Sequence, residues 1–103
     1  MVAAKKYRSV TQDLTADYDR RADVLYVLVG APVEAEGDGR PDGIELNFTV
    51  ADDTPCGVTV IGFKRYGWPD RLAALADLTA KHLSVQPSSV LEHVKHAVSQ
   101  ASA

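Results

Sequence analysis

Three aspartates cluster around one short polar segment and are the most promising residues for chemistry in this sequence. Asp17 and Asp19 are two residues apart, which places two strand side chains on one face, and Asp23 follows after a pair of arginines. Carboxylates on one face could share a cation or act as an acid–base pair. Aspartates also accept main-chain hydrogen bonds in turns and pair with arginines at the surface. We favour the turn and predict no metal site and no catalytic residue here.

Two histidines, His93 and His96, are three residues apart in a segment with helical spacing, so their side chains could share one face. A metal would need a third ligand from elsewhere, such as His82. We expect solvated surface histidines instead.

Cys56 follows a proline near two aspartates, and acidic neighbours raise a thiol pKa, which is unfavourable for a nucleophile. We expect a partly buried, unreactive cysteine and no cofactor.

The segment from Lys64 to Trp68 mixes basic and aromatic residues. Such a mixture can bind single-stranded nucleic acid, with Lys5, Lys6 and Arg8 as further bases, but one short cluster on an acidic chain is weak support. We therefore expect no nucleic acid. Aromatic residues and arginine are also enriched at protein interfaces. The prediction is that these residues plug the junction of sheet and helices or form an interface, with Arg65, Tyr66 and Trp68 as the interface residues.

Glycines and prolines interrupt the chain between residues 30 and 42. The Gly37-Asp38-Gly39 run lacks the following helix of a phosphate loop and the acid spacing of a calcium loop. We therefore interpret it as a flexible turn. Within the same loop, residues 33–36 could form a short edge extension, because charged side chains are common on sheet edges.

The length of 103 residues, with 46% hydrophobic and 24% charged residues, predicts one folded domain over residues 1–103. No apolar run approaches the roughly 20 residues of a membrane span, so we expect no membrane contact. The single cysteine excludes an internal disulfide and favours a cytoplasmic location.

Charge is unevenly distributed along the chain. Residues 14–56 carry ten acids against three arginines, a net charge of −7, whereas residues 57–103 carry +2. Such separation suits a basic partner or self-association, and equally suits solvated faces without a partner.

Alternating and continuous apolar runs predict four β-strands, over residues 14–19, 24–29, 43–50 and 57–65. The run at 24–29 is apolar throughout, which is typical of a central strand covered on both faces. Strands joined by short connections usually pair as neighbours. We therefore predict a four-stranded antiparallel β-meander over residues 14–65.

Helical spacing replaces the alternation over residues 69–101 and predicts two amphipathic helices packed on the sheet. Pro69 suits the first turn of one helix. Ser89 and Glu92 are spaced like a capping box at the start of the other. The predicted fold class is α+β.

The stretch from Tyr18 to about Arg65 resembles the domain of unknown function 2283 family of small bacterial and phage proteins. The resemblance lies in a Tyr-Asp-x-x-Ala-Asp-x-Leu-Tyr run from Tyr18 to Tyr26, in acids at Glu34 and Glu36, and in two strand-like runs, over residues 43–46 and 57–61. It implies a β-meander with a helix and no catalytic residues. Some members are encoded beside small toxin-like proteins, which implies an antitoxin-like partner role.

Two functional hypotheses follow. The first is a non-catalytic protein–protein interaction module that forms homo-oligomers, such as homodimers, or pairs with a basic partner, because an open sheet has exposed edges. The second is a small-ligand-binding protein or weak enzyme with a pocket between sheet and helices. Its polar groups would be Asp19, Asp23 and Tyr26.

Overall fold

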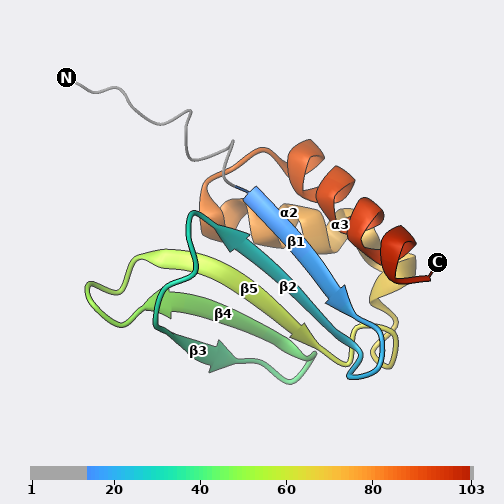
Figure 1. The fold of residues 1–103 in the computed structure, drawn as a ribbon, viewed down its shortest axis with the longest axis horizontal. Coiled ribbons are helices and arrows are strands. Elements are labelled where there is room, and N and C mark those ends of the chain that lie inside the picture. The colour runs from blue at the N-terminus through green and yellow to red at the C-terminus, as the bar shows by residue number, and fades with distance from the viewer. Residues whose placement is uncertain (1–13, 103) are drawn as a thin grey trace.

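A computed structural model describes residues 14–102 and shows an α+β fold in which one antiparallel sheet carries a layer of helices (Figure 1). The C-terminal helices predicted from the sequence are present, and the broad fold class is confirmed. No helix in the described range is long and apolar enough to cross a membrane. The elements are β1 Leu14–Asp19, β2 Val24–Val29, β3 Ala35–Gly39, β4 Ile44–Thr49, β5 Pro55–Ile61, η2 Trp68–Arg71, α2 Leu72–Leu83 and α3 Pro87–Ser102.

The sheet has five strands in the order β1-β2-β5-β4-β3, so the predicted four-stranded meander is wrong in number and order. The chain leaves β2, crosses to the far edge as β3, and returns through β4 to pair β5 with β2 (Figure 1). The two most apolar strands thereby become neighbours in the middle of the sheet, where burial of apolar surface is greatest. The additional strand, β3, lies at a sheet edge and is exposed at every residue. It overlaps the edge extension proposed over residues 33–36, whereas the interpretation of Gly37-Asp38-Gly39 as a flexible turn is wrong.

The β1–β2 hairpin forms in the predicted place, with Tyr18 opposite Leu25 and Leu14 opposite Val29. Its helix-facing side chains are buried: Leu25 is 0% and Val27 1% exposed. The expectation that both faces of β2 are covered is wrong, because Tyr26 on the other face is 42% exposed. The sheet therefore has an open face, which carries Tyr26 and its alternating neighbours, and a helix-facing side.

Helix α2 packs on β5, and α3 packs on β1 and on α2. In Figure 1 the helices lie behind and beside β1, β2 and β5, whereas β4 and β3 extend past them. Between the two layers, apolar side chains fill the core: Val58, Val60, Phe63, Leu75, Val90 and Val94 are all at most 1% exposed. In this layered arrangement each amphipathic helix buries its one apolar stripe.

Strand β5 ends earlier than the sequence predicts, at Ile61, because Gly62 turns the chain with a φ of 75°. Consequently Ile61 lies on the open face at 48% exposure, while Phe63 is buried in the core from the following turn. The predicted capping box is also absent from the start of α3. That helix begins at Pro87, which a first-turn proline permits, so Ser89 already lies inside it.

Gly43 lies where the turn between β3 and β4 passes close to the end of β5. Its φ is 87°, and a Cβ placed on it would overlap the main-chain oxygen of Ile61. Gly30 has a similar φ of 79°, but a Cβ there would meet nothing within 4 Å. A side chain at Gly30 would therefore cost only backbone strain, whereas a side chain at Gly43 would cost backbone strain and a steric clash.

We predict that Gly30→Ala lowers the free energy of unfolding by about 1–2 kcal/mol, the cost of a left-handed alanine. Gly43→Ala adds a clash with main chain and is expected to cost roughly 3 kcal/mol or more. Urea unfolding followed by circular dichroism measures both. Equal losses for the two variants would contradict the close packing of the turn against β5.

Candidate interaction surface

Asp23 holds the β1–β2 turn to the loop that follows β5. Its carboxylate accepts hydrogen bonds from the Tyr18 hydroxyl at 2.7 Å, the Lys64 amide at 2.8 Å and the Arg65 amide at 3.2 Å. Its main-chain oxygen accepts the amides of Gly62 and Phe63. Asp23 adopts a left-handed φ of 59°, which aspartate tolerates better than most residues. The carboxylate is therefore engaged in folding contacts.

These contacts change the acidity of both side chains. Partial burial alone would raise the pKa of the Asp23 carboxyl, but the hydrogen bonds from Lys64, Tyr18 and Arg65 outweigh it and hold that pKa below its ordinary value. Burial, followed by the hydrogen bond to the Asp23 carboxylate, raises the pKa of Tyr18 to about 12. The pair is thus a neutral phenol donating to an ionised carboxylate at neutral pH.

The other predicted ligand residues lie elsewhere. Asp19 accepts main-chain hydrogen bonds from Arg21 at 3.1 Å and Ala22 at 3.2 Å, the turn contacts expected of an aspartate there. Tyr26 lies on the open face opposite Asp17, with its side chain directed away from the helices. Asp19 and Tyr26 therefore share the open face, whereas the Asp23 carboxylate is held against the β5–η2 loop.

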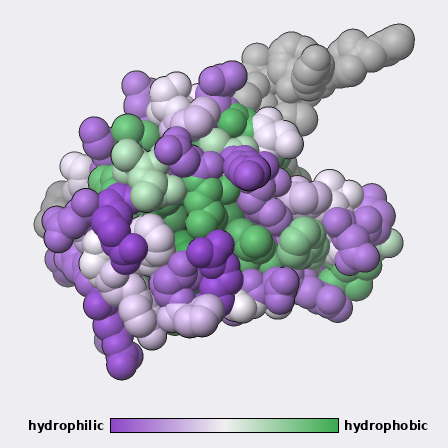
Figure 2. Space-filling model, turned by 180° about the vertical axis from the view of Figure 1, so that it is seen from behind, coloured by the Kyte–Doolittle hydropathy of each residue, from purple (hydrophilic) through white to green (hydrophobic). Residues whose placement is uncertain are grey.

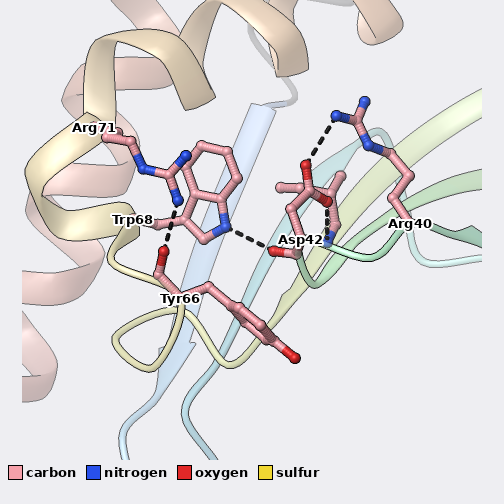
Figure 3. A network of polar contacts seen from close by, with 6 residues as sticks. Arg40, Asp42, Tyr66, Trp68 and Arg71 are labelled. Carbon is pink, nitrogen blue, oxygen red and sulfur yellow. Dashed lines mark hydrogen bonds and ion pairs between the residues drawn. The ribbon is translucent and has the colours of Figure 1, made fainter.

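Of the three predicted interface residues, Trp68 is 4% exposed and buried in the core. Its indole N–H donates to the main-chain oxygen of Asp42 at 3.0 Å, and the Arg71 guanidinium stacks over its ring at 4.0 Å (Figure 3). Asp42 also pairs with Arg40 at 2.9 Å. Trp68 therefore plugs the junction of sheet and helices, and the network fixes the base of the β3–β4 hairpin against η2. Tyr66 and Arg65 remain exposed beside it.

The histidines do not converge. His93 Nδ1 lies 2.7 Å from the main-chain oxygen of Ser89, and His96 is exposed. His82 Nε2 lies 3.1 Å from the main-chain oxygen of Asn47, and its ring meets Phe48 edge-on with centroids 5.0 Å apart. Within residues 14–102, no group of three or more histidine, cysteine, aspartate or glutamate side chains could hold a metal. Of the three, only His82 connects two elements, α2 and β4.

A hollow of about 300 Å³ opens between the β2–β3 connection and the sheet. Its lining includes Leu28, Asn47, Cys56 and Thr59, and the Thr59 hydroxyl donates to Asn47 Oδ1 at 2.8 Å. Cys56 is 8% exposed, and burial raises the pKa of its thiol, as is typical of an unreactive cysteine. None of the predicted ligand residues Asp19, Asp23 and Tyr26 lines this hollow.

The β3 edge is the most exposed part of the sheet, with its own acids on one face and an acid of β4 leaning across the other. Glu36 lies opposite Phe48 and Asp38 opposite Leu46, so both acids are on the helix-facing side. The alternate positions, Ala35, Gly37 and Gly39, face the open side without bulky side chains. A Cβ placed on Gly37 would overlap the Glu45 carboxylate, which shows that Glu45 leans across β3. None of the site residues predicted from the sequence lies on β3, although the alternation of acids with small residues is a signal of an edge.

Apolar surface adjoins this acidic edge on the helix-facing side. Seen from behind, Figure 2 shows hydrophobic residues in a band across the middle of the molecule, bordered by hydrophilic ones. Leu46 of β4 and Leu72 and Leu78 of α2 are packed against the core but only partly buried. The β3–β4 side of the sheet, together with the adjoining part of α2, thus combines acidic groups with partly exposed apolar groups, a composition suited to binding a polypeptide.

Comparison of the chain with protein-family models, with curated proteins and with solved structures finds no match. The resemblance to the domain of unknown function 2283 family therefore stays a prediction from the sequence.

We predict that Asp23→Asn lowers the free energy of unfolding by about 1–3 kcal/mol at pH 7, because charge-assisted hydrogen bonds to the turn are weakened. A carboxyl whose folded pKa is depressed stabilises the fold above its unfolded pKa, about 3.9, and loses that effect as the pH falls through the folded pKa. The difference between wild type and Asp23→Asn should therefore shrink at pH 2–3. Urea unfolding at both pH values measures it, with the exposed Asp17→Asn as the matched control. A difference that does not change with pH would contradict the assigned role of Asp23.

Proposed function

We propose that this protein is a non-catalytic protein–protein interaction module that pairs with a basic partner. The observation that carries the proposal is the acidic, fully exposed edge strand β3, left uncovered by the helices. An unpaired sheet edge is a template for another chain, and acids along it select for positive charge. The engagement of the Asp23 carboxylate by main-chain amides also supports a structural over a catalytic role for that residue.

The resemblance to the domain of unknown function 2283 family suggests that this protein binds its basic partner as an antitoxin binds its toxin. Charge separation supports the same idea. The acidic segment of residues 14–56 contributes the whole sheet except β5, whereas the bases of residues 57–103 lie beyond it. The electrostatic field would therefore steer a basic protein toward the acidic strands of the sheet and away from the helices.

Capture from extracts of the native host tests the proposal. Immobilised protein is expected to retain a basic polypeptide at low salt and release it as the ionic strength rises, since screening weakens pairing between exposed charges. An unrelated acidic protein of equal net charge is the control. A retained set identical to that of the control would overturn the proposal.

Self-association is the second candidate, and the open face favours it. Tyr26 is 42% and Ile61 48% exposed there, on the neighbouring strands β2 and β5. Two open faces could pack as a sandwich of sheets about a two-fold axis, with these side chains at the centre.

Light scattering after size exclusion distinguishes the two modes. If the open face forms a homodimer, the wild type should show twice the chain mass, and Ile61→Lys should restore the single-chain mass by placing a charge in the interface. Val50→Lys, at a residue 45% exposed in the β4–β5 turn, is the matched control and should remain dimeric. A wild type of single-chain mass at about millimolar concentration, where most specific dimers form, contradicts self-association.

A further inference from the structure

The outer edge of β3 offers main-chain groups to an added strand. The Val50 amide donates to the Glu34 oxygen at 3.0 Å, and the Arg40 amide donates to the Ile44 oxygen at 2.8 Å. Because the hydrogen-bonded pairs of an antiparallel ladder alternate, even-numbered residues of this strand direct their main chain toward β4. Ala35, Gly37 and Gly39 therefore direct their N–H and C=O groups away from the sheet.

The side chains along this edge define what an added strand would meet. On the helix-facing side it would run beside Glu36 and Asp38, two residues apart and both exposed. On the open side it would run beside Gly37, where the Glu45 carboxylate leans across. A residue of the added strand opposite Gly37 would thus have the Glu45 carboxylate within reach on the open face. Three carboxylates bracket the edge from both faces.

Charge excludes a second copy of this strand as the occupant. If two β3 strands paired antiparallel about Gly37, Glu36 of each copy would lie opposite Asp38 of the other. Like charges directly opposite in a sheet destabilise the pairing. A strand with lysine or arginine at the same spacing turns each of those contacts into an attraction.

We propose that β3 binds a partner by strand addition, and that the partner segment is an extended strand with basic residues at positions i and i+2 beside Glu36 and Asp38. The residue between them lies over Gly37 and hydrogen-bonds to it through the main chain. Main-chain pairing supplies affinity and the alternating side chains supply specificity, as in other strand-addition complexes. This inference rests on the proposed function and names the surface and the class of partner.

Titration of the isotope-labelled protein with short peptides, followed by amide chemical shifts, tests the proposal. The probe is a seven-residue peptide, acetyl-Thr-Val-Lys-Thr-Lys-Val-Thr-amide. A second peptide replaces its central threonine by proline, which keeps both charges but removes the donor opposite Gly37. A third replaces both lysines by glutamates. We expect the first peptide to shift the amides of residues 35–39, and both others to bind about tenfold more weakly or not at all.

Variants of the protein provide the complementary test. Glu36→Lys combined with Asp38→Lys should abolish binding of the lysine peptide and permit binding of the glutamate peptide. Asp17→Lys combined with Asp77→Lys changes the net charge equally, at exposed sites on β1 and α2, and should keep the wild-type preference. Equal loss in both double variants would show that net charge alone attracts the peptide, and would overturn strand addition at β3.

The outcomes also separate this inference from the proposed function. If the proline peptide binds as well as the threonine peptide, or if shifts concentrate around Tyr26 and Ile61, strand addition is wrong while binding of basic polypeptides stands. If no peptide binds but the host extract yields a salt-sensitive basic partner, again only strand addition is wrong. If the extract yields no such partner, the proposed function itself is wrong.

Discussion

The pairing of β5 with β2 at the centre of the sheet determines where every other element lies. Leu25 opposite Val60 and Val27 opposite Val58 are four side chains at most 1% exposed, and they form the floor on which the helices rest. Apolar strands gain most from central positions, where neighbours cover both edges and the helix layer covers one face. Once these two strands pair, β1 remains on one side of the sheet, and β4 with β3 on the other.

Two polar anchors then fix the loops at one end of this sheet. Asp23 gathers the β1–β2 turn and the loop after β5 through its carboxylate and its main-chain oxygen. The Trp68 indole reaches the Asp42 oxygen and so joins η2 to the β3–β4 turn. The Asp23 oxygens accept hydrogen bonds from main-chain amides, and the Trp68 indole N–H donates one in a partly buried site, where an unpaired group would be costly. The Trp68 contact holds the base of the β3–β4 hairpin, while β3 itself stays exposed along its length.

This construction explains why charge collects where it does. Strand β3 lies beyond the helices and is exposed throughout, and Glu45 of β4 leans across the open face, so these acids need no buried partner. Within the described residues, the one ion pair is Arg40 with Asp42, which leaves Glu36, Asp38 and Glu45 without a cationic partner. The acids protect the edge against a second copy by like-charge repulsion, and the same acids favour a basic strand. Protection of the edge and the proposed recognition of a basic strand thus rest on one set of side chains.

The sequence alone determined the elements whose residues carry a strong local pattern. Alternation and apolar runs predicted β1, β2 and β4 within about a residue, and helical spacing predicted α2 and α3, because these patterns express which face each element buries. Turn chemistry correctly predicted the contacts of Asp19. The local pattern fails to predict two features. Gly62 ends β5 before Phe63, although the apolar run continues. The run Ala35–Gly39 forms a strand although it has no apolar residue larger than alanine.

Tertiary structure alone decided the strand order, the partners of Asp23 and the formation of an acidic edge. Pairing β5 with β2 joins residues about 30 positions apart or more, and the Asp23 carboxylate meets amides more than 40 positions away. No local spacing encodes such contacts, because they follow from the competition of all strands for the buried centre of the sheet. The three aspartates that first suggested chemistry are strand and turn residues in the fold. The candidate surface lies on β3, which becomes an edge only when β5 takes the place beside β2.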